Sequence, residues 1–165
     1  MEYTIERAKP GDEAILAYIQ TESWKAGFKD ILPADILCRC TQMDRVTAMY
    51  RRDLARNTGN GYLLKVGGDP HCIAWWDATR EKDMPGYAEL ICIHSLQNRW
   101  RNGYGSKMMD AVLRDIGAAG YTKVMLWVFE ANTRARRFYE AQGFTTSGKR
   151  KPNLTPAEIC YEKSL

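Results

Sequence analysis

Hydrophobic and polar residues follow two spacings along the chain, one typical of strands and the other typical of helices. Residues 3–8 alternate in polarity and predict a first strand. A turn follows, Asp12 is the expected N-cap, and apolar residues from Ile15 onward predict a helix that ends near Ser23. Pro33 favours the start of a second helix, because the N–H that proline lacks would have no partner at that position.

The second helix is expected to continue to Leu54, since residues 57–61 are rich in Asn and Gly and predict a turn. Residues 62–66 and 72–76 are both apolar and β-rich, and the segment 67–70 between them contains two glycines and a proline. This pattern predicts a hairpin of two antiparallel strands.

The last part of the chain alternates strands and helices. Residues 87–96 predict a strand of mixed faces, 123–129 a β-rich strand, and 159–162 a final strand. Asn132 is expected to cap a short helix that a glycine ends after Gln142. The clearest helix has one apolar face, made by Met108, Met109, Val112, Leu113 and Ile116. This order of elements predicts a layered α/β or α+β fold.

The composition of the 165 residues is that of a globular protein, with 45% hydrophobic and 27% charged residues. This length suits a single domain over residues 1–165 and allows a core that needs no disulfide or metal. No apolar run approaches the roughly 20 residues that a membrane span needs. The N-terminus lacks the basic-then-apolar layout of a signal peptide, so we expect a cytoplasmic protein with no membrane partner.

Charge and cysteine content argue against two further classes. The chain has 24 Lys and Arg residues against 20 Asp and Glu, a formal charge of +4, and we therefore expect no nucleic-acid partner. The densest basic cluster, residues 148–151, is interpreted as a solvated loop. Five cysteines without a Cys-x-x-Cys pair, with only two histidines, predict reduced thiols and no metal site.

The most informative segment places Gly103-Tyr104-Gly105 directly between a predicted strand and the clearest helix. The first N–H groups of a helix are unpaired and carry the positive end of its dipole, and glycine allows an anion to approach them closely. The arrangement predicts a phosphate cradle, although the same pattern also fits a simple turn. A Walker motif is absent, and Met108 occupies the position of the third glycine in a dinucleotide fingerprint.

Residues 132–144 carry a resemblance to a known family. They match the pattern Asn-x-x-Ala-x-x-Phe-Tyr-x-x-x-Gly-Phe at every named position. Residues 88–106 contain a similar glycine loop, with matches at Gly103 and Gly105, and residues 22–33 are similar to a first-helix region. The family that these segments resemble is the GNAT family of acetyl-CoA-dependent N-acetyltransferases, and the likeness covers nearly the whole chain.

The resemblance implies an α/β (α+β) fold with a mixed, mostly antiparallel central sheet flanked by helices. It also implies acetyl-CoA as cosubstrate, with its diphosphate in the loop 101–106 and its pantetheine arm at the preceding strand end. The implied cofactor-binding residues are Ser95, Leu96, Arg101, Asn102, Gly103, Tyr104, Gly105, Ser106, Asn132 and Tyr139. Trp100 departs from the family, which has Gln or Arg at this position, and Gln97 stands where many members have proline.

The resemblance also implies catalytic roles. Tyr139 is expected near the sulfur, where its O–H can protonate the leaving thiolate. Glu89 is the expected base, because members that acetylate histones have a glutamate base in a similar strand; His94 and a water chain are the alternatives. By strand parity, Glu89 is expected on one face with Ser95, and His94 on the other face with Cys92.

The expected activity is direct transfer of an acetyl group to a primary amine of a small molecule or a peptide. The identity of this acceptor stays open, and a homodimer is compatible with the sequence. Aromatic residues that suit either an acceptor pocket or a plain core are Trp24, Phe28, Trp75 and Trp76. Asp77 or Glu22 is a candidate for attracting the acceptor ammonium. The alternative to an enzyme is a catalytically silent acyl-CoA-binding sensor or interaction module, which the departure at Trp100 keeps open.

Overall fold

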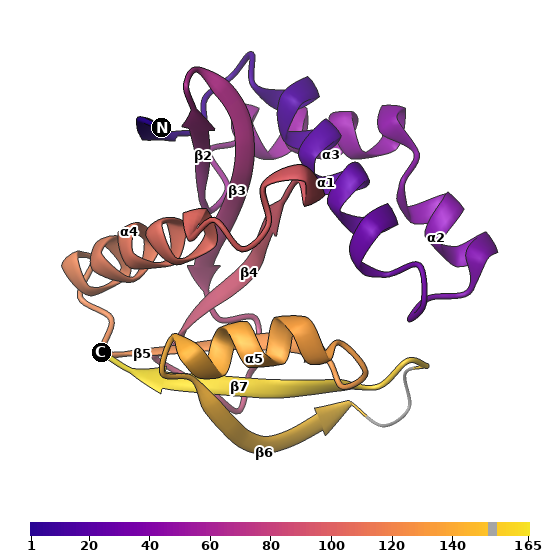
Figure 1. Cartoon of the computed structure of the whole chain (residues 1–165). Helices are drawn as coiled ribbons and strands as arrows, with labels where there is room; N and C mark the ends of the chain where they lie inside the picture. Colours follow the sequence, from indigo (N-terminus) through magenta and orange to yellow (C-terminus); the bar gives the residue numbers. More distant parts are fainter. Residues whose placement is uncertain (152–154) are drawn as a thin grey trace.

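One sheet of seven strands organises the chain in a computed structural model that describes residues 1–151 and 155–165 (Figure 1). The strands are β1 (Tyr3–Arg7), β2 (Asn60–Val66), β3 (Asp69–Ala78), β4 (Ala88–Ser95), β5 (Lys123–Phe129), β6 (Thr145–Lys151) and β7 (Glu158–Ser164). Their order across the sheet is β1-β2-β3-β4-β5-β7-β6, and each neighbouring pair is antiparallel except β4 and β5. The predicted mixed, mostly antiparallel sheet is therefore confirmed.

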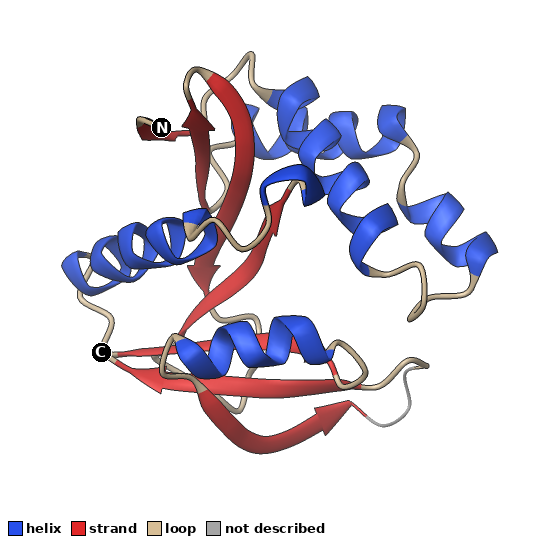
Figure 2. Ribbon diagram, in the orientation of Figure 1, coloured by secondary structure: helices blue, strands red, loops and turns tan. Residues whose placement is uncertain are grey.

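Helices flank this sheet on both faces (Figure 2). They are α1 (Glu13–Gly27), α2 (Ala34–Cys40), α3 (Met43–Ala55), α4 (Tyr104–Ala118), α5 (Thr133–Ala141) and the short 3-10 helix η1 (Gln97–Arg99). Helices α4 and α5 pack on the face that carries Leu90 and Leu126, whereas α1 and α3 pack on the face that carries Ile73. In the described residues, 1–151 and 155–165, no helix has the length and apolarity required to cross a membrane.

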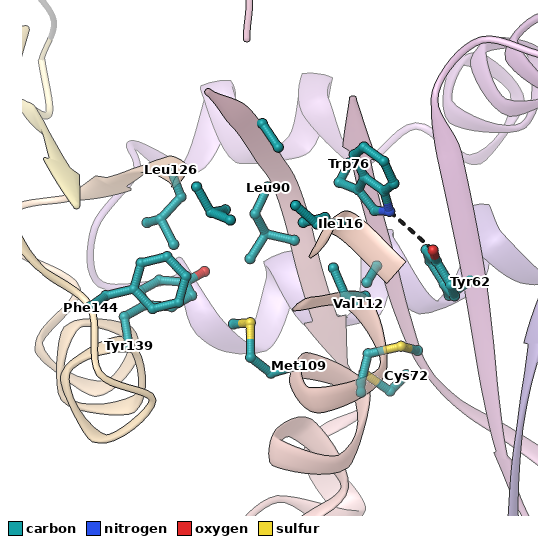
Figure 3. Packing of buried hydrophobic residues seen from close by; sticks show 14 of the residues in the cluster. Tyr62, Cys72, Trp76, Leu90, Met109, Val112, Ile116, Leu126, Tyr139 and Phe144 are labelled. Atoms are coloured by element: carbon teal, nitrogen blue, oxygen red, sulfur yellow. Dashed lines mark hydrogen bonds between the residues drawn. The ribbon is translucent and has the colours of Figure 1, made fainter. Parts of the chain in front are cut away.

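The larger core lies between the sheet and the helices α4 and α5. Figure 3 shows its centre, where Leu90 of β4, Met109 of α4 and Phe144 come together, each with at most 3% of its surface exposed. The indole N–H of Trp76 donates to the hydroxyl of Tyr62 at 3.0 Å inside this core. Because buried apolar surface is the dominant stabilising term, this packing fixes α4 and α5 against the strands that border the candidate site.

Two of the predicted helices differ from those in the structure. Helix α1 continues beyond its predicted end to Gly27. Asp12 holds the N-cap position of α1, but its carboxylate accepts the backbone N–H of Lys9 at 2.9 Å and makes no cap bond to the helix. The predicted second helix is two helices, α2 and α3. They separate at Gln42, which has an extended backbone; just before it, the Thr41 hydroxyl donates to a carbonyl of the last turn of α2 at 2.7 Å.

The prediction of a solvated loop at residues 148–151 is wrong, because these residues belong to the edge strand β6. Their side chains alternate between exposed and half-buried positions, and Lys149 and Arg150 pair with Asp83 and Glu130. Charged side chains on an edge strand discourage pairing with another chain. The strand lacks the apolar alternation by which sequence analysis finds strands, since only one face of it meets the rest of the molecule.

Candidate functional site

The candidate site lies where the parallel strands β4 and β5 separate. They pair only at their first residues, Ala88 with Val124 and Glu89 with Met125. Beyond these pairs the two strands diverge, as Figure 1 shows. A cavity of about 1380 Å³ lies there, lined by the rest of both strands, by α1 and α3 on one face of the sheet, and by α5 and the loop before α4 on the other. This volume is above the range of about 300–1,000 Å³ usual for small-molecule sites, so the cavity can hold a large cofactor together with a second ligand.

The loop before α4 ends in a set of free backbone donors. Gly103 has a left-handed backbone with φ of +80°, which glycine adopts at no steric cost, and a Cβ added there would meet no atom within 4 Å. Helix α4 begins at Tyr104 without a side-chain cap, and within the described chain no acceptor reaches the N–H groups of Tyr104, Gly105 and Ser106. Open space beside three unpaired donors at a positive helix end fits the diphosphate of coenzyme A.

Trp100 brings an additional positive charge to this loop. Its indole N–H donates to the carbonyl of Ser95 at 3.0 Å, which fixes the ring against the end of β4. The guanidinium of Arg134, from the first turn of α5, lies 3.8 Å from the centre of that ring. Cation–π stacking of this kind holds the arginine at the cavity wall. The sequence did not predict this pair, because Trp100 and Arg134 come together only in the folded chain. The one sequence signal was the aromatic residue at the position where the family it resembles has Gln or Arg.

Asn132 caps α5 and also borders the cavity. Its side-chain carbonyl accepts the N–H of Ala135 at 3.2 Å, as an N-cap residue does, and only 7% of its surface is exposed. The cap therefore fixes the start of α5, where Arg134 leaves the helix, at the edge of the site.

Tyr139 is 9% exposed and lies in the wall of the cavity, beside Phe144 (Figure 3). Its hydroxyl makes no hydrogen bond within residues 1–151 and 155–165, unlike the hydroxyls of Tyr62 and Tyr161. Burial raises the pKa of Tyr139 above its ordinary value, the neighbouring Cys92 adds to this, and the charge of Arg134 lowers the pKa in part. The phenol is therefore protonated at neutral pH and has a hydrogen to donate into the cavity.

Glu89 is 1% exposed and its carboxylate is fully engaged by one arginine. The backbone N–H, Nε and Nη2 of Arg80 donate to its two oxygens at 3.2, 2.8 and 2.8 Å. Burial would raise the pKa of Glu89, but the hydrogen bonds and charge of Arg80 outweigh it, so the pKa lies below its ordinary value. Arg80 itself lines the cavity, whereas Glu89 stands behind it.

His94 lies in the cavity wall and accepts the indole N–H of Trp24 at Nε2, 3.1 Å away. Burial and, to a smaller extent, the charge of Arg134 lower the pKa of His94 to about 4. The imidazole is therefore neutral at pH 7 and carries its hydrogen on Nδ1, since Nε2 is the acceptor. A group with this pKa is a weak base at neutral pH.

The predicted arrangement of faces along β4 is wrong. Trp75 of β3 pairs with Cys92, but the next residue of β3 pairs with Leu90, so Ile91 is an extra residue in the ladder. Such a bulge shifts the alternation by one. As a result His94 lies on the same face as Glu89, the face covered by α1 and α3.

The structure brings most of the residues predicted for cofactor binding to this one cavity. Those that line it are Ser95, Arg101, Gly103, Tyr104, Gly105, Ser106, Asn132 and Tyr139. Leu96 packs instead against the core under α1 and α3, and the side-chain amide of Asn102 donates to the carbonyl of Arg99 at 3.2 Å.

Of the residues considered for binding the acceptor, some line the cavity and others lie outside it. Trp24, Phe28 and Trp75 line the cavity, and so does Asp77. Trp76 belongs to the opposite core with α4 and α5, and Glu22 pairs with Lys25 at 2.8 Å outside the cavity.

Comparisons with known proteins agree with this architecture. The family model described as Acetyltransferase (GNAT) family matches residues 31–144. A probable N-acetyltransferase of Mycobacterium tuberculosis is 24% identical over 146 residues, which cover 88% of this chain and 81% of that protein. The crystal structure of the PaiA N-acetyltransferase from Thermoplasma acidophilum, in complex with coenzyme A, has a TM-score of 0.86 and 15% identity over 100% of both chains. A ribosomal-protein-alanine N-acetyltransferase from Brucella melitensis has a TM-score of 0.75 and 13% identity, covering 98% of this chain and 99% of that one.

Proposed function

Because the chain belongs to the acetyltransferase (GNAT) family, we propose that it transfers an acetyl group from acetyl-CoA to a primary amine by direct attack. The thioester supplies the activated acetyl group when it is bound. The observation that carries the proposal is the position of Tyr139, a buried, protonated phenol whose hydroxyl borders the same cavity as the free donors of α4. A proton donor beside an anion-binding helix end is the arrangement that thioester aminolysis needs.

The cofactor-binding role is assigned to the loop before α4 and the end of β4. The N–H groups of Tyr104, Gly105 and Ser106 would bind the diphosphate, with Arg134 as a neighbouring charge. The backbone at Ser95 would pair with the pantetheine arm. These roles need backbone groups more than a particular side chain, so Trp100 is compatible with binding.

Tyr139 is assigned as the acid. Only a neutral amine is nucleophilic, so an alkylamine must first lose a proton. The new C–N bond then forms as the C–S bond breaks. The Tyr139 hydroxyl gives its proton to the sulfur, and water passes the second proton of the amine nitrogen to the Tyr139 phenolate. A backbone N–H at the end of β4 would bind the negative charge that develops on the carbonyl oxygen.

The sequence predicts Glu89 as the base, whereas the geometry favours water as the first acceptor of the amine proton. Both Glu89 oxygens accept hydrogen bonds from Arg80, and the carboxylate does not reach the cavity wall. We assign Glu89 as a positioning residue that holds Arg80, and water within the cavity as the acceptor of the amine proton.

Calorimetry with coenzyme A and a thiol-release assay with a panel of primary amines test the proposal together. We expect coenzyme A to bind and free thiol to appear only when an amine is present. Binding without turnover on a broad panel would favour the silent acyl-CoA-binding module instead, and a lack of binding by folded protein would refute both.

A further inference from the structure

One buried histidine has no hydrogen-bonding partner in the protein. Only 2% of the surface of His71, in β3, is exposed, and within the described residues its Nδ1 is the one buried side-chain nitrogen or oxygen without a partner. The other ring nitrogen, Nε2, makes no hydrogen bond within residues 1–151 and 155–165 either. Because burying a polar group without a partner costs free energy, the position of this imidazole calls for an explanation.

A bulge in β3 directs the imidazole toward the start of α4. Lys65 of β2 pairs with Pro70, whereas the residue before it pairs with Cys72, so His71 is an extra residue in the ladder. Cys72 packs in the core with α4, and strict alternation would direct His71 to the other face of the sheet. Instead, the His71 ring is in edge contact with the ring of Tyr104, with the ring centres 5.4 Å apart. Bulges redirect side chains in this way and are frequent beside functional sites.

His71 lies against the loop that is assigned to the cofactor. Tyr104 is the first residue of α4, and its backbone N–H is one of the free donors. The backbone carbonyl of His71 accepts the N–H of Leu96 at 3.0 Å, where β4 passes into the loop. Arg99 of η1 is near enough for its charge to act on the imidazole. Both ends of the segment 96–104 and its arginine therefore lie near His71, which lines the same cavity as this loop.

The imidazole is an uncharged donor. Burial and, to a smaller extent, the charge of Arg99 lower the pKa of His71 below its ordinary value. Arg99 is itself held by the carboxylate of Asp69 at 3.1 Å and by the carbonyl of Val66 at 3.2 Å. Placed on Nδ1, the single ring hydrogen would be enclosed without an acceptor, whereas Nε2 is not enclosed in this way and the residue borders the cavity. The hydrogen is therefore assigned to Nε2, where it can reach a ligand.

We propose that His71 is a further cofactor-binding residue, whose Nε2–H donates a hydrogen bond to a phosphate oxygen of bound coenzyme A. This inference rests on the proposed function, since it requires the cofactor in the cavity. Hydrogen bonds to a charged acceptor are stronger than those between neutral groups, so a neutral donor is sufficient. The free protein keeps a buried polar group at a cost in stability, and the hydrogen bond to the cofactor offsets that cost.

Three substitutions separate this hydrogen bond from packing. His71→Gln can place an N–H near the position of Nε2, His71→Asn can place one near the position of Nδ1, and His71→Phe keeps a ring without any donor. Calorimetry with coenzyme A should give a Kd within about threefold of wild type for His71→Gln, and a Kd at least about tenfold higher for His71→Asn and His71→Phe. The KM for acetyl-CoA should follow the same order with little change in kcat, because the hydrogen bond is made equally in the ground state and the transition state.

Folding stability gives a readout that a purely structural role would move in the opposite direction. In urea unfolding without cofactor, His71→Phe should have a midpoint equal to or above that of wild type, because it removes a buried polar group that has no partner. A structural role predicts a lower midpoint and a Kd that does not depend on which ring nitrogen is replaced. Should His71→Phe fold poorly, the comparison of His71→Gln with His71→Asn decides. Thr21→Val, which removes a buried hydroxyl of α1 outside the cavity, is the matched control and should leave the Kd unchanged.

NMR can observe the imidazole directly, because the chain contains only two histidines. Proton–nitrogen spectra of protein labelled in its histidines should show His71, assigned by His71→Gln, as the neutral tautomer with its hydrogen on Nε2. Coenzyme A should shift this Nε2–H signal. Dephospho-coenzyme A, which keeps the diphosphate and lacks the 3′-phosphate, identifies the acceptor: an equal shift supports a bond to the diphosphate, and loss of the shift supports a bond to the 3′-phosphate.

The outcomes separate this inference from the proposed function. Coenzyme A binding that leaves the His71 signal in place, or an equal Kd for wild type, His71→Asn and His71→Phe, overturns the inference and leaves acetyl transfer intact. A loss of affinity in His71→Gln as large as that in His71→Asn also overturns it. Failure of folded wild-type protein to bind coenzyme A refutes the proposed function itself.

Discussion

The pair of Arg80 and Glu89 gives the sharpest test of how the site is built. The Glu89 side chain is 2% exposed and that of Arg80 is 66% exposed, so the two partners of one ion pair differ widely in burial. Arg80→Ala leaves a buried carboxylate without its two side-chain donors, and breaking a buried pair in this way costs about 3–5 kcal/mol. We expect about 3 kcal/mol, at the low end, because the Arg80 end of the pair is solvated.

Glu89→Gln removes the same interaction without leaving a buried charge, and the exposed guanidinium can return to water. We therefore expect a smaller loss of about 1–2 kcal/mol. In the Arg80→Ala background, Glu89→Gln should restore about 1 kcal/mol, because it removes the uncompensated carboxylate. Urea unfolding at pH 7 of the wild type, both single variants and the double variant measures these differences. A double variant less stable than Arg80→Ala would refute the reasoning.

The direction in which the contribution of the Arg80–Glu89 pair to folding stability changes with pH follows from the pKa of Glu89. The pKa of Glu89 is lowered in the folded protein, because the hydrogen bonds and charge of Arg80 outweigh the effect of burial. The pair therefore stabilises the fold above the unfolded pKa of about 4.3, and this contribution is lost as pH falls through the lower folded pKa. The stability difference between wild type and Glu89→Gln should be full at pH 7 and shrink below pH of about 4.

The same variants decide between the two roles of Glu89. A positioning role predicts that Arg80→Ala and Glu89→Gln lower kcat to a similar extent and leave the midpoint of the pH–rate profile unchanged. A base role predicts that Arg80→Ala, which frees the carboxylate and raises its pKa, keeps activity above neutral pH while Glu89→Gln loses it.

Four further variants test the site and its support. Tyr139→Phe should lower kcat by about 10²-fold with little change in coenzyme A affinity, and unchanged turnover across pH would contradict the acid role. Arg134→Ala should raise the KM for acetyl-CoA several-fold, because it removes the cation at the diphosphate loop, and calorimetry with coenzyme A checks this. Asn132→Ala should cost about 1 kcal/mol in urea unfolding through loss of the α5 cap, and an unchanged midpoint would show that the cap contributes nothing. Tyr62→Phe leaves the buried Trp76 N–H without its acceptor and should cost about 1–3 kcal/mol by the same measurement.

The parts of the site that depend on local sequence could be predicted. The conformation of a glycine turn before an apolar-faced helix depends mainly on the turn residues themselves. Gly103 adopts a left-handed backbone, and the first backbone N–H groups of α4 are free. Asn132 likewise caps the helix that it was expected to cap. Such features depend on a few neighbouring residues, which the sequence displays directly.

Features that depend on distant contacts could not be predicted. Arg134 and Trp100 belong to different elements, and only the packing of α5 beside the α4 loop brings them within 3.8 Å. The residues around Glu89 in the sequence do not indicate that Arg80, nine positions earlier, donates hydrogen bonds to both of its carboxylate oxygens. The break between α2 and α3 was missed for a related reason, because nothing in the neighbouring sequence signals the extended backbone of Gln42.

The bulge at Ile91 explains how β4 presents His94 and Ser95, which both line the cavity, on opposite faces of the sheet. With unbroken alternation, Glu89 and Ser95 would share a face, and Ser95 could not stand beside the α4 loop while Glu89 faces α1 and α3. The extra residue reverses the pattern, so Ser95, paired with Cys72, lies on the side of α4, while His94 joins Glu89 on the side of α1 and α3. A bulge has no strong sequence signal in an apolar strand, yet this one determines which side chains of β4 lie on each face of the sheet. Deleting Ile91 removes the extra residue and leaves Glu89 and His94 on one face and Ser95 on the other, so folded protein should still bind coenzyme A in calorimetry, and loss of binding would show that the bulge itself shapes the site.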